Sequence, residues 1–248
     1  MMYPSRGRAR LGIFVPFTNT NLEPDMTLLR PDGVSLHFAR LGGYDEDEIP
    51  DEAQMAGLGS SNIDAEIDLL LGAKPDVVIY GCTSATLAHG PAFDRNLAAT
   101  ITARSGAHTV TAAGAIVHAI RALGSTKIGF ASPYVPSLND KAIDFLANEG
   151  IKTLARADFD GRLGNEGQGA LEPSDVLALG QRADGPDVQA IVLSCTDMRA
   201  VEIIPKLETI TGKPGVTSNQ AIMFQAMQLL GLQDAFVGFG RLSERFGQ

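Results

Sequence analysis

Two cysteines are the residues of this sequence whose type and surroundings best fit a chemical role. Cys82 and Cys195 each follow an apolar run, and each is followed by threonine. A thiolate can accept a proton or attack carbon, and a thiol can donate a proton. Inverting a weakly acidic carbon next to a carboxylate requires a base on one face and an acid on the other. A pair of thiols can supply both, so this pattern indicates proton transfer at carbon.

The side chains next to the cysteines suit the binding of a carboxylate. Thr83, Ser84 and Thr196 carry hydroxyl groups that, with neighbouring backbone amides, can hydrogen-bond the negative charge that develops on carboxylate oxygens. A helix that begins just after each cysteine would also favour the thiolate. This chemistry needs no cofactor, and we expect none.

Other roles for the cysteines are less consistent with the sequence. A single free cysteine is often only a small buried hydrophobic residue, but two at matching places of a repeat argue against a packing coincidence. The chain has no export signal, so a structural disulfide is not expected. No His or Cys lies at a recognisable metal-ligand spacing from either thiol, so we expect no metal.

The elements that must position these residues follow an alternating pattern. Apolar, β-branched runs are followed by turn residues and then by helical patterns, which is typical of parallel strands with crossover helices. Strands are expected at 11–16, 77–80, 109–111, 128–131, 190–193 and 216–217. Apolar residues at three-four spacing predict helices at 61–71, 93–104, 114–123, 139–148, 173–183, 201–210 and 220–230. The fold class is therefore α/β.

An internal repeat divides the chain into two related halves. Arg10-Leu-Gly-Ile-Phe-Val-Pro16 resembles Lys127-Ile-Gly-Phe-Ala-Ser-Pro133, and the segments around the two cysteines match as well. We expect two Rossmann-like halves with parallel sheets, related by a pseudo-twofold axis. The first lobe comprises 1–113 and 219–248 and the second 114–218, with approximate bounds and a last helix that can cross over. The active site is expected in the cleft between them, because ligands bind at the C-terminal ends of strands in open α/β sheets.

Composition limits the partners of the protein. The chain has 248 residues, 44% of them hydrophobic, and a formal net charge of −9, as expected for an acidic globular protein. Its 20 Lys and Arg residues form no stripe, so no nucleic-acid partner is expected. No apolar run approaches the roughly 18–20 residues of a membrane helix, and the first residues have no secretory signal pattern. We predict a cytoplasmic protein that does not bind membranes and acts on a small-molecule carboxylate.

Several further residues have two competing interpretations. The acidic, glycine-flanked segment 41–60 is expected to be a surface loop, with a gating lid as the alternative. His89 is expected in a surface or helix-cap role, although a histidine near a thiol can assist proton transfer. Asp197 could orient a proton on Cys195 or cap a following helix, and Arg199 could pair with a substrate carboxylate or face solvent.

The paired Cys-Thr motifs in two related α/β halves resemble the aspartate/glutamate racemase superfamily, over about residues 10–241. Details are similar to the branch that holds maleate isomerase and arylmalonate decarboxylase. Val15-Pro-Phe-Thr-Asn-Thr20 and Ser132-Pro-Tyr-Val135 are similar to segments of that branch, and Gly164-Asn-Glu-Gly167 lies where the isomerases have a further asparagine. The resemblance implies that Asn19 binds the substrate carboxylate, that Tyr134 donates to the carboxylate or to an oxyanion, and that Asn165 binds the substrate. It also implies a homo-oligomer.

The chain departs from each member of that branch. Arylmalonate decarboxylase has a single catalytic thiol, equivalent to Cys195, and a glycine where Cys82 stands. The segments after both cysteines differ from those of the maleate isomerases, and Ser194 to Arg199 resembles a racemase associated with ectoine utilisation. We therefore expect a racemase or isomerase that uses two cysteines as an acid/base pair. The alternatives are a maleate-type cis-trans isomerase with Cys82 as nucleophile, an arylmalonate-type decarboxylase with Cys195 as proton donor, and a non-catalytic carboxylate-binding protein.

Overall fold

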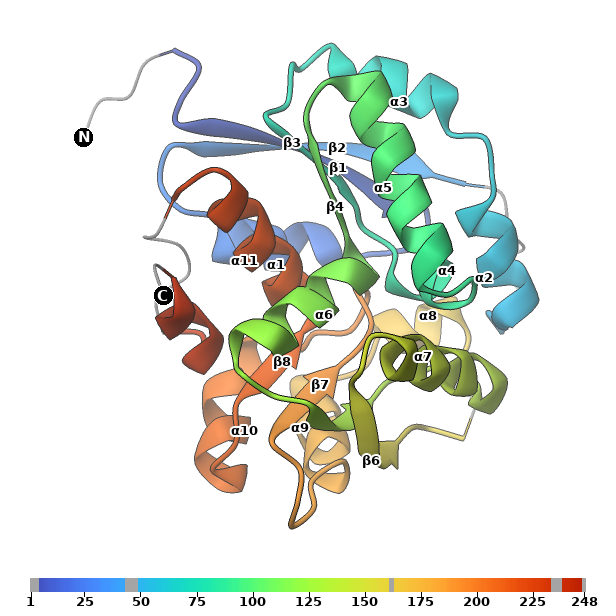
Figure 1. Cartoon of the computed structure of the whole chain (residues 1–248), viewed down its shortest axis with the longest axis vertical. Helices are drawn as coiled ribbons and strands as arrows, with labels where there is room; N and C mark the ends of the chain where they lie inside the picture. The colour runs from blue at the N-terminus through green and yellow to red at the C-terminus, as the bar shows by residue number, and fades with distance from the viewer. Residues whose placement is uncertain (1–4, 43–48, 161–162, 233–237, 247–248) are drawn as a thin grey trace.

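Two parallel sheets of four strands each form the framework of the protein (Figure 1). The structure is a computed structural model, and it describes residues 5–42, 49–160, 163–232 and 238–246. The first sheet has the strand order β2-β1-β3-β4, with β1 (Ala9–Pro16), β2 (Val34–Leu41), β3 (Val77–Tyr80) and β4 (His108–Thr111). The second sheet has the equivalent order β6-β5-β7-β8, with β5 (Lys127–Ala131), β6 (Lys152–Ala157), β7 (Ala190–Leu193) and β8 (Gly215–Thr217). The α/β class and the two related halves are confirmed, whereas the residue bounds of the two lobes remain a prediction.

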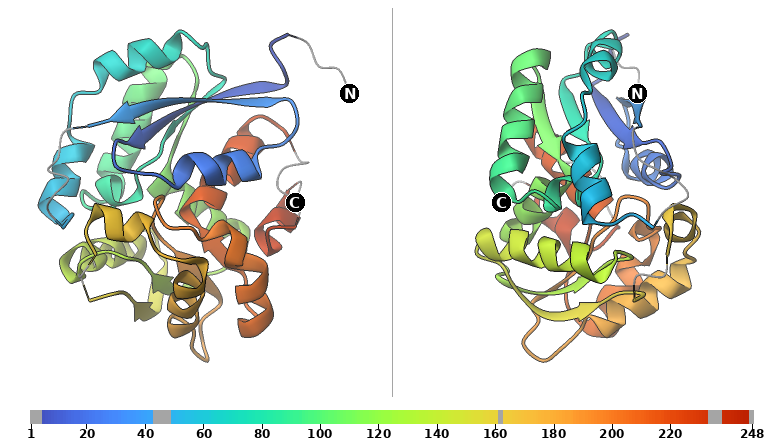
Figure 2. Two further views of the ribbon diagram at one scale, coloured as in Figure 1. Left: turned by 180° about the vertical axis from the view of Figure 1, so that it is seen from behind. Right: turned by 90° about the vertical axis from the view of Figure 1, so that its right-hand side faces the viewer.

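Helices cover both sheets and join the two halves (Figure 2). The first half contains α1 (Leu22–Leu29), α2 (Glu52–Gly59), α3 (Asp64–Leu71), α4 (Thr83–Leu87), α5 (Pro91–Ser105) and α6 (Ala112–Ala122). The second contains α7 (Pro136–Asn148), α8 (Asn165–Gly169), α9 (Pro173–Arg182), α10 (Ile204–Thr211) and α11 (Ser218–Leu229), with 3-10 turns at Val201–Ile203 and Arg241–Arg245. The helices α6 and α11, which follow the last strand of each sheet, pack against one another. No helix in the described part of the chain is long and apolar enough to cross a membrane.

All six predicted strands are present, and two edge strands were missed. The central strands β1, β3, β5 and β7 are almost entirely buried, which explains their continuous apolar sequences. The edge strands β2 and β6 are only partly buried and alternate polar with apolar residues, so they lack that signal. Their addition gives each half the topology of a complete four-stranded parallel sheet.

The segment 41–60 is not a continuous surface loop. Leu41 ends β2, and Glu52–Gly59 forms α2, while 43–48 lies outside the described residues. Asp51 caps α2 by accepting hydrogen bonds of 2.9 Å from the backbone amides of Ala53 and Gln54. An Asp at this position satisfies amides that have no partner within the helix. The prediction of a loop is therefore wrong for residues 52–59.

Candidate active site

The C-terminal ends of four central strands carry the predicted site. Asn19 follows β1 and Tyr134 follows β5, while Cys82 follows β3 and Cys195 follows β7. Since β1 and β5 occupy equivalent positions in the two sheets, as do β3 and β7, each half contributes one cysteine and one polar side chain from matching loops. The expected site between the halves follows from this repeated topology.

A small cavity of about 40 Å³ brings these residues together. Both cysteines, Asn19, Tyr134 and Met55 contribute to its wall. The complete set of described residues around it is Pro16, Thr18, Asn19, Pro50, Met55, Cys82, Ser84, Tyr134, Leu138, Asn165, Gln168, Cys195, Thr196 and Asp197. A cavity of this size holds only a few water molecules. The cysteines therefore lie at a narrow cavity with room for only small groups.

A wider cavity of about 520 Å³ lies next to the small one. Thr18, Asn165 and Asp197 line both, so they form the boundary between them. The rest of its described lining comprises Thr20, Glu166, Gly169 and Ala170. The outer cavity provides an approach to the cysteines from the side of α8.

Cys82 lies at the start of a short helix and is only 4% exposed. Its Sγ is 3.6 Å from Ser84 Oγ, and Ser84 in turn donates a hydrogen bond of 3.1 Å to Met55 Sδ. Burial raises the pKa of the Cys82 thiol, while hydrogen bonds from the backbone amide of Ala85 and from Ser84 oppose the rise. The start of α4 thus favours the thiolate as predicted, but burial outweighs it.

Cys195 differs from the prediction because no helix begins after it. Thr196 to Ala200 form turns and irregular structure, and regular helix resumes only at Ile204. The backbone amide of Asp197 is 3.4 Å from Sγ, and the thiol donates to Gln168 Oε1 at 3.8 Å. Burial first, and then the charge of Asp197, raises the pKa of the Cys195 thiol well above its ordinary value. The helix start that was predicted to favour a thiolate is absent here, and the hydrogen bond from the Asp197 amide lowers the pKa by less than burial raises it.

Thr196 and Asn19 link the two halves directly beneath the cavity. Asn19 Nδ2 donates to Thr196 Oγ1 at 3.0 Å, and that hydroxyl donates to the carbonyl oxygen of Gly81 at 3.0 Å. Asn19 Oδ1 also accepts from the backbone amide of Leu22 at 2.9 Å. The hydrogen of the Thr196 hydroxyl is therefore used in holding the residue before Cys82, whereas one hydrogen of the Asn19 amide group remains for a ligand.

Tyr134 is fixed by its own loop and points toward the second cysteine. Asn139 Nδ2 donates to its carbonyl oxygen at 3.1 Å, and its hydroxyl lies 3.4 Å from Ser194 Oγ. Burial raises the pKa of Tyr134 well above its ordinary value, and its hydroxyl interacts with Cys195 and Thr83. A tyrosine that stays protonated is a suitable hydrogen-bond donor to a carboxylate.

One predicted residue, Thr83, does not line the small cavity. Thr83 is outside the described lining of the small cavity, and its hydroxyl donates to Ser218 Oγ at 2.9 Å. Its position at the base of α4 makes it a support for Cys82 and Tyr134. Direct contact of Thr83 with substrate remains a prediction, as do the roles of the other predicted residues.

Gln168 and Met55 are among the cavity residues that sequence reasoning missed. Gln168 lies on α8 one turn after Asn165, so a three-residue spacing placed both on one helix face. Met55 lies on α2, whose start is indicated by Asp51 followed three residues later by Gln54, a pattern typical of a helix N-terminus. The helix α2 lies in the acidic segment that was predicted to be a loop, and α8 lies in a glycine-rich segment for which no helix was predicted.

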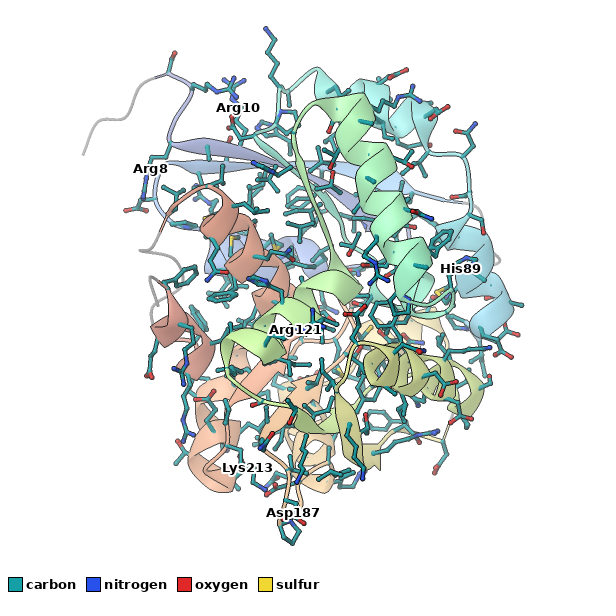
Figure 3. The ribbon with its side chains drawn as sticks, in the orientation of Figure 1. Arg8, Arg10, His89, Arg121, Asp187 and Lys213 are labelled. Atoms are coloured by element: carbon teal, nitrogen blue, oxygen red, sulfur yellow. The ribbon has the colours of Figure 1, made fainter. Side chains whose placement is uncertain are left out.

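Two other candidates are engaged in structural contacts. His89 hydrogen-bonds the carbonyl oxygen of Ala56 at 2.8 Å and stacks on Phe93, which places it beside α2 (Figure 3). This agrees with its expected structural role. Arg199 forms an exposed ion pair of 2.7 Å with Glu202. No group of three or more His, Cys, Asp or Glu residues that could hold a metal occurs among the residues described.

Comparisons with known proteins match nearly the whole chain. A maleate isomerase of Nocardia farcinica is 27% identical over 253 residues, which cover 95% of this chain and 96% of the relative. An arylmalonate decarboxylase of Bordetella bronchiseptica is 27% identical over 92% of this chain and 90% of its own length. The crystal structure of a maleate isomerase from Pseudomonas putida S16 superimposes with a TM-score of 0.85 at 25% identity, covering 96% of this chain and 98% of that one.

The family model for arylmalonate decarboxylase matches residues 11–243. The predicted resemblance to the maleate isomerase and arylmalonate decarboxylase branch is thereby confirmed. The relatives are isomerases and a decarboxylase with the same two-sheet framework, and the chain is an enzyme of this cysteine-based class. The protein belongs to the arylmalonate decarboxylase family.

Proposed function

We propose that the protein is a racemase or related isomerase of a small carboxylic acid, with Cys82 and Cys195 as an acid/base pair. The observation that carries the proposal is that two free cysteines, one from each half, line the same small cavity. Cys82 occupies the position at which the decarboxylases have glycine according to the resemblance. The second thiol has no purpose in a reaction that delivers a proton to one face only.

The proposed reaction balances without a cofactor. One cysteine, as the thiolate, removes the proton from the carbon next to the substrate carboxylate and becomes a thiol. The other cysteine donates its proton to the opposite face of the enolate-like intermediate and becomes the thiolate. Asn19 and Tyr134 donate hydrogen bonds to the carboxylate oxygens, on which negative charge accumulates during the reaction.

The ionisation of the thiols is the step that requires substrate binding. Burial raises the pKa of both cysteines. The neutral thiol is therefore the resting form at neutral pH, and one of the two thiols must release its proton to solvent, leaving a thiolate, when the substrate brings donors or positive charge into the cavity. Such an arrangement protects the cysteines from reaction between turnovers.

A cis-trans isomerisation of an unsaturated acid is the second candidate. The similarity of this chain to maleate isomerases over more than nine-tenths of its length favours it. In this reaction the Cys82 thiolate adds to the double bond, the resulting single bond rotates, and elimination restores the alkene. Cys195 stabilises or protonates the intermediate before the elimination.

A screen in deuterium oxide distinguishes the two reactions. Small 2-amino, 2-hydroxy and unsaturated acids are incubated with the enzyme and followed by proton NMR, chiral chromatography and ultraviolet absorbance. Racemisation replaces the proton on the reacting carbon by deuterium and erodes optical purity, with no loss of an enoate band. Conversion of an unsaturated acid without exchange in any saturated acid would refute the racemase proposal.

The two cysteines are tested separately by substitution with serine. Cys82→Ser and Cys195→Ser should each lower turnover at least about a hundredfold, since general acid–base catalysis typically contributes 10²–10⁴-fold. Thermal unfolding should change little, because the substitution keeps the size of the side chain. A variant that retains more than a tenth of wild-type turnover would show that its thiol is not part of an acid/base pair.

A further inference from the structure

Asp197 uses only one of its two carboxylate oxygens in the hydrogen bonds that hold the neighbouring loop. Its Oδ1 accepts from the backbone amides of Thr20 and Asn21 at 2.8 and 3.0 Å, and from the Asn21 side chain at 3.2 Å. These bonds anchor the loop that carries Asn19. Oδ2 takes part in none of them, although the residue is only 8% exposed. The structural role of Asp197 is thus fulfilled by half of its carboxylate.

The position of Asp197 gives the second oxygen access to a ligand. Asp197 lines both the small cavity with the cysteines and the wide outer cavity. Gly169 keeps the space beside it open, because a Cβ atom at that position would lie only 3.0 Å from Oδ2 and 3.1 Å from Thr20 Oγ1. A ligand that reaches the thiols through the outer cavity therefore passes this oxygen.

The charge around the two cavities is negative. Their described lining includes the carboxylates of Glu166 and Asp197 and contains no Lys, Arg or His. A second carboxylate of a substrate would meet like charge here, and the repulsion is strongest beside the buried Asp197. A positively charged group would instead gain a charge-assisted hydrogen bond.

We infer that Asp197 determines substrate specificity, with its Oδ2 binding an ammonium group of the substrate on or next to the reacting carbon. The inference rests on the proposed racemase function and narrows its substrate class to amino acids. The carboxylate of the substrate meets Asn19 and Tyr134, and its ammonium group meets Asp197 at the opening toward the outer cavity. A dicarboxylate has no positively charged group that could pair with Asp197.

Ammonium binding also activates the cysteines. Burial is the main cause of the raised pKa of both thiols, and the negative charge of Asp197 adds to the rise. An ammonium group paired with Asp197 offsets that charge and so favours a thiolate at the moment the substrate is in place. A substrate without an ammonium group, such as a 2-hydroxy acid of the same shape, does not offset the charge of Asp197 and leaves the thiols in their resting form.

Matched pairs of substrates test the inference. The probes are alanine with lactate, 2-aminobutyrate with 2-hydroxybutyrate, and serine with glycerate, together with maleate, each followed for exchange or isomerisation in deuterium oxide. The wild type should exchange the amino acid of each pair at least about tenfold faster than the hydroxy acid. The hydroxy acid cannot form the hydrogen bond between charged groups, and the loss of such a bond typically lowers binding or rate about tenfold or more. Asp197→Asn should remove most of this preference.

The choice of variants separates recognition from structure. An asparagine at 197 retains an Oδ1 acceptor for the Thr20 and Asn21 amides but replaces the charged Oδ2 by an amide nitrogen. Its thermal unfolding should therefore match that of the wild type. The control is Asp187→Asn, an exposed acidic residue at the far end of the second half (Figure 3), which should leave the amino-to-hydroxy ratio unchanged. Gly169→Ala, which crowds Oδ2, should lower the ratio like Asp197→Asn.

The outcomes distinguish the inference from the function on which it rests. Equal or faster exchange of the hydroxy acids, or an unchanged ratio in Asp197→Asn, overturns the inference while the racemase proposal stands. Conversion of maleate with no exchange in any saturated acid overturns both. An amino-acid preference that Asp197→Asn abolishes and Asp187→Asn preserves supports the assignment.

Discussion

Replacing Thr196 by valine should destabilise the protein more than any other removal of a single hydroxyl near the site. Thr196 is only 4% exposed. Its hydroxyl accepts a hydrogen bond from Asn19 Nδ2 and donates one to the Gly81 carbonyl oxygen. Valine has nearly the same shape, so the variant leaves two buried polar groups without partners and creates no cavity. Each such group costs about 1–3 kcal/mol, and the added methyl group offsets part of this, so we expect a loss of about 2–4 kcal/mol.

Equilibrium unfolding in urea measures this loss. The midpoint should fall with an unchanged slope, as expected for a change in stability alone, and the melting temperature should fall by roughly 4–16 °C. Thr196→Ser keeps the hydroxyl and should recover most of the stability. Thr209→Val removes an exposed hydroxyl on α10 that bonds only the Pro205 carbonyl oxygen, and it should stay within about 0.5 kcal/mol of wild type. If Thr196→Val matched the Thr209→Val control, the link between the halves would carry no stability.

Three further predictions concern the tyrosine and the titrating groups of the site. Tyr134→Phe should weaken substrate binding or turnover roughly tenfold to a hundredfold, measured as kcat/KM, because a donor to a charged carboxylate is lost; unchanged kinetics would remove this role. Alkylation by iodoacetamide should be slower for the wild type without substrate than for Asp197→Asn at the same pH, since the charge of Asp197 adds to the rise in pKa that burial causes in Cys82 and Cys195; equal rates would contradict this electrostatic effect. Burial raises the pKa of Asp25 to about 7 from 3.8, so its contribution to stability is present below about pH 4 and is lost as pH rises through about 7. Asp25→Asn should therefore flatten the decline in unfolding free energy over this range, and a variant with the wild-type slope would show that Asp25 does not titrate there.

The central strands and the cysteine loops were predictable because each leaves a local signal. Buried parallel strands such as β3 and β7 are continuous apolar runs, and the repeated Cys-Thr pair marks their ends. Parallel topology then brings those ends to one edge of each sheet. The convergence of Cys82, Cys195, Asn19 and Tyr134 on one cavity agrees with this reasoning.

The edge strands and the short helices gave weaker signals. In β2, His37 and Arg40 interrupt the apolar pattern because this strand is only partly covered. Between its ends, Asn165 and Gly169, the helix α8 contains only polar residues and a glycine, which are typical of loops or polar surfaces. Its one buried side chain, Gln168, faces the cavity. Such elements are fixed by tertiary contacts that a local pattern does not contain.

The protonation state of the thiols was beyond the sequence. A helix that begins just after each cysteine was expected to favour the thiolate, but the chain after Cys195 turns without forming a helix. Burial of the cavity and the nearby charge of Asp197 then dominate. Both depend on how the two halves close over one another, and the identity of the neighbouring residues along the chain does not reveal it.

Exchange measured separately on each enantiomer tests the two-cysteine mechanism most directly. Pure L and D forms of the substrate that the wild type racemises are incubated in deuterium oxide with Cys82→Ser and with Cys195→Ser. If the cysteines face opposite sides of the substrate, each variant loses racemisation but keeps proton exchange on one enantiomer only, and the two variants keep opposite enantiomers. Retention of the same enantiomer by both variants, or racemisation that survives either substitution, would contradict the assignment of one thiol to each face.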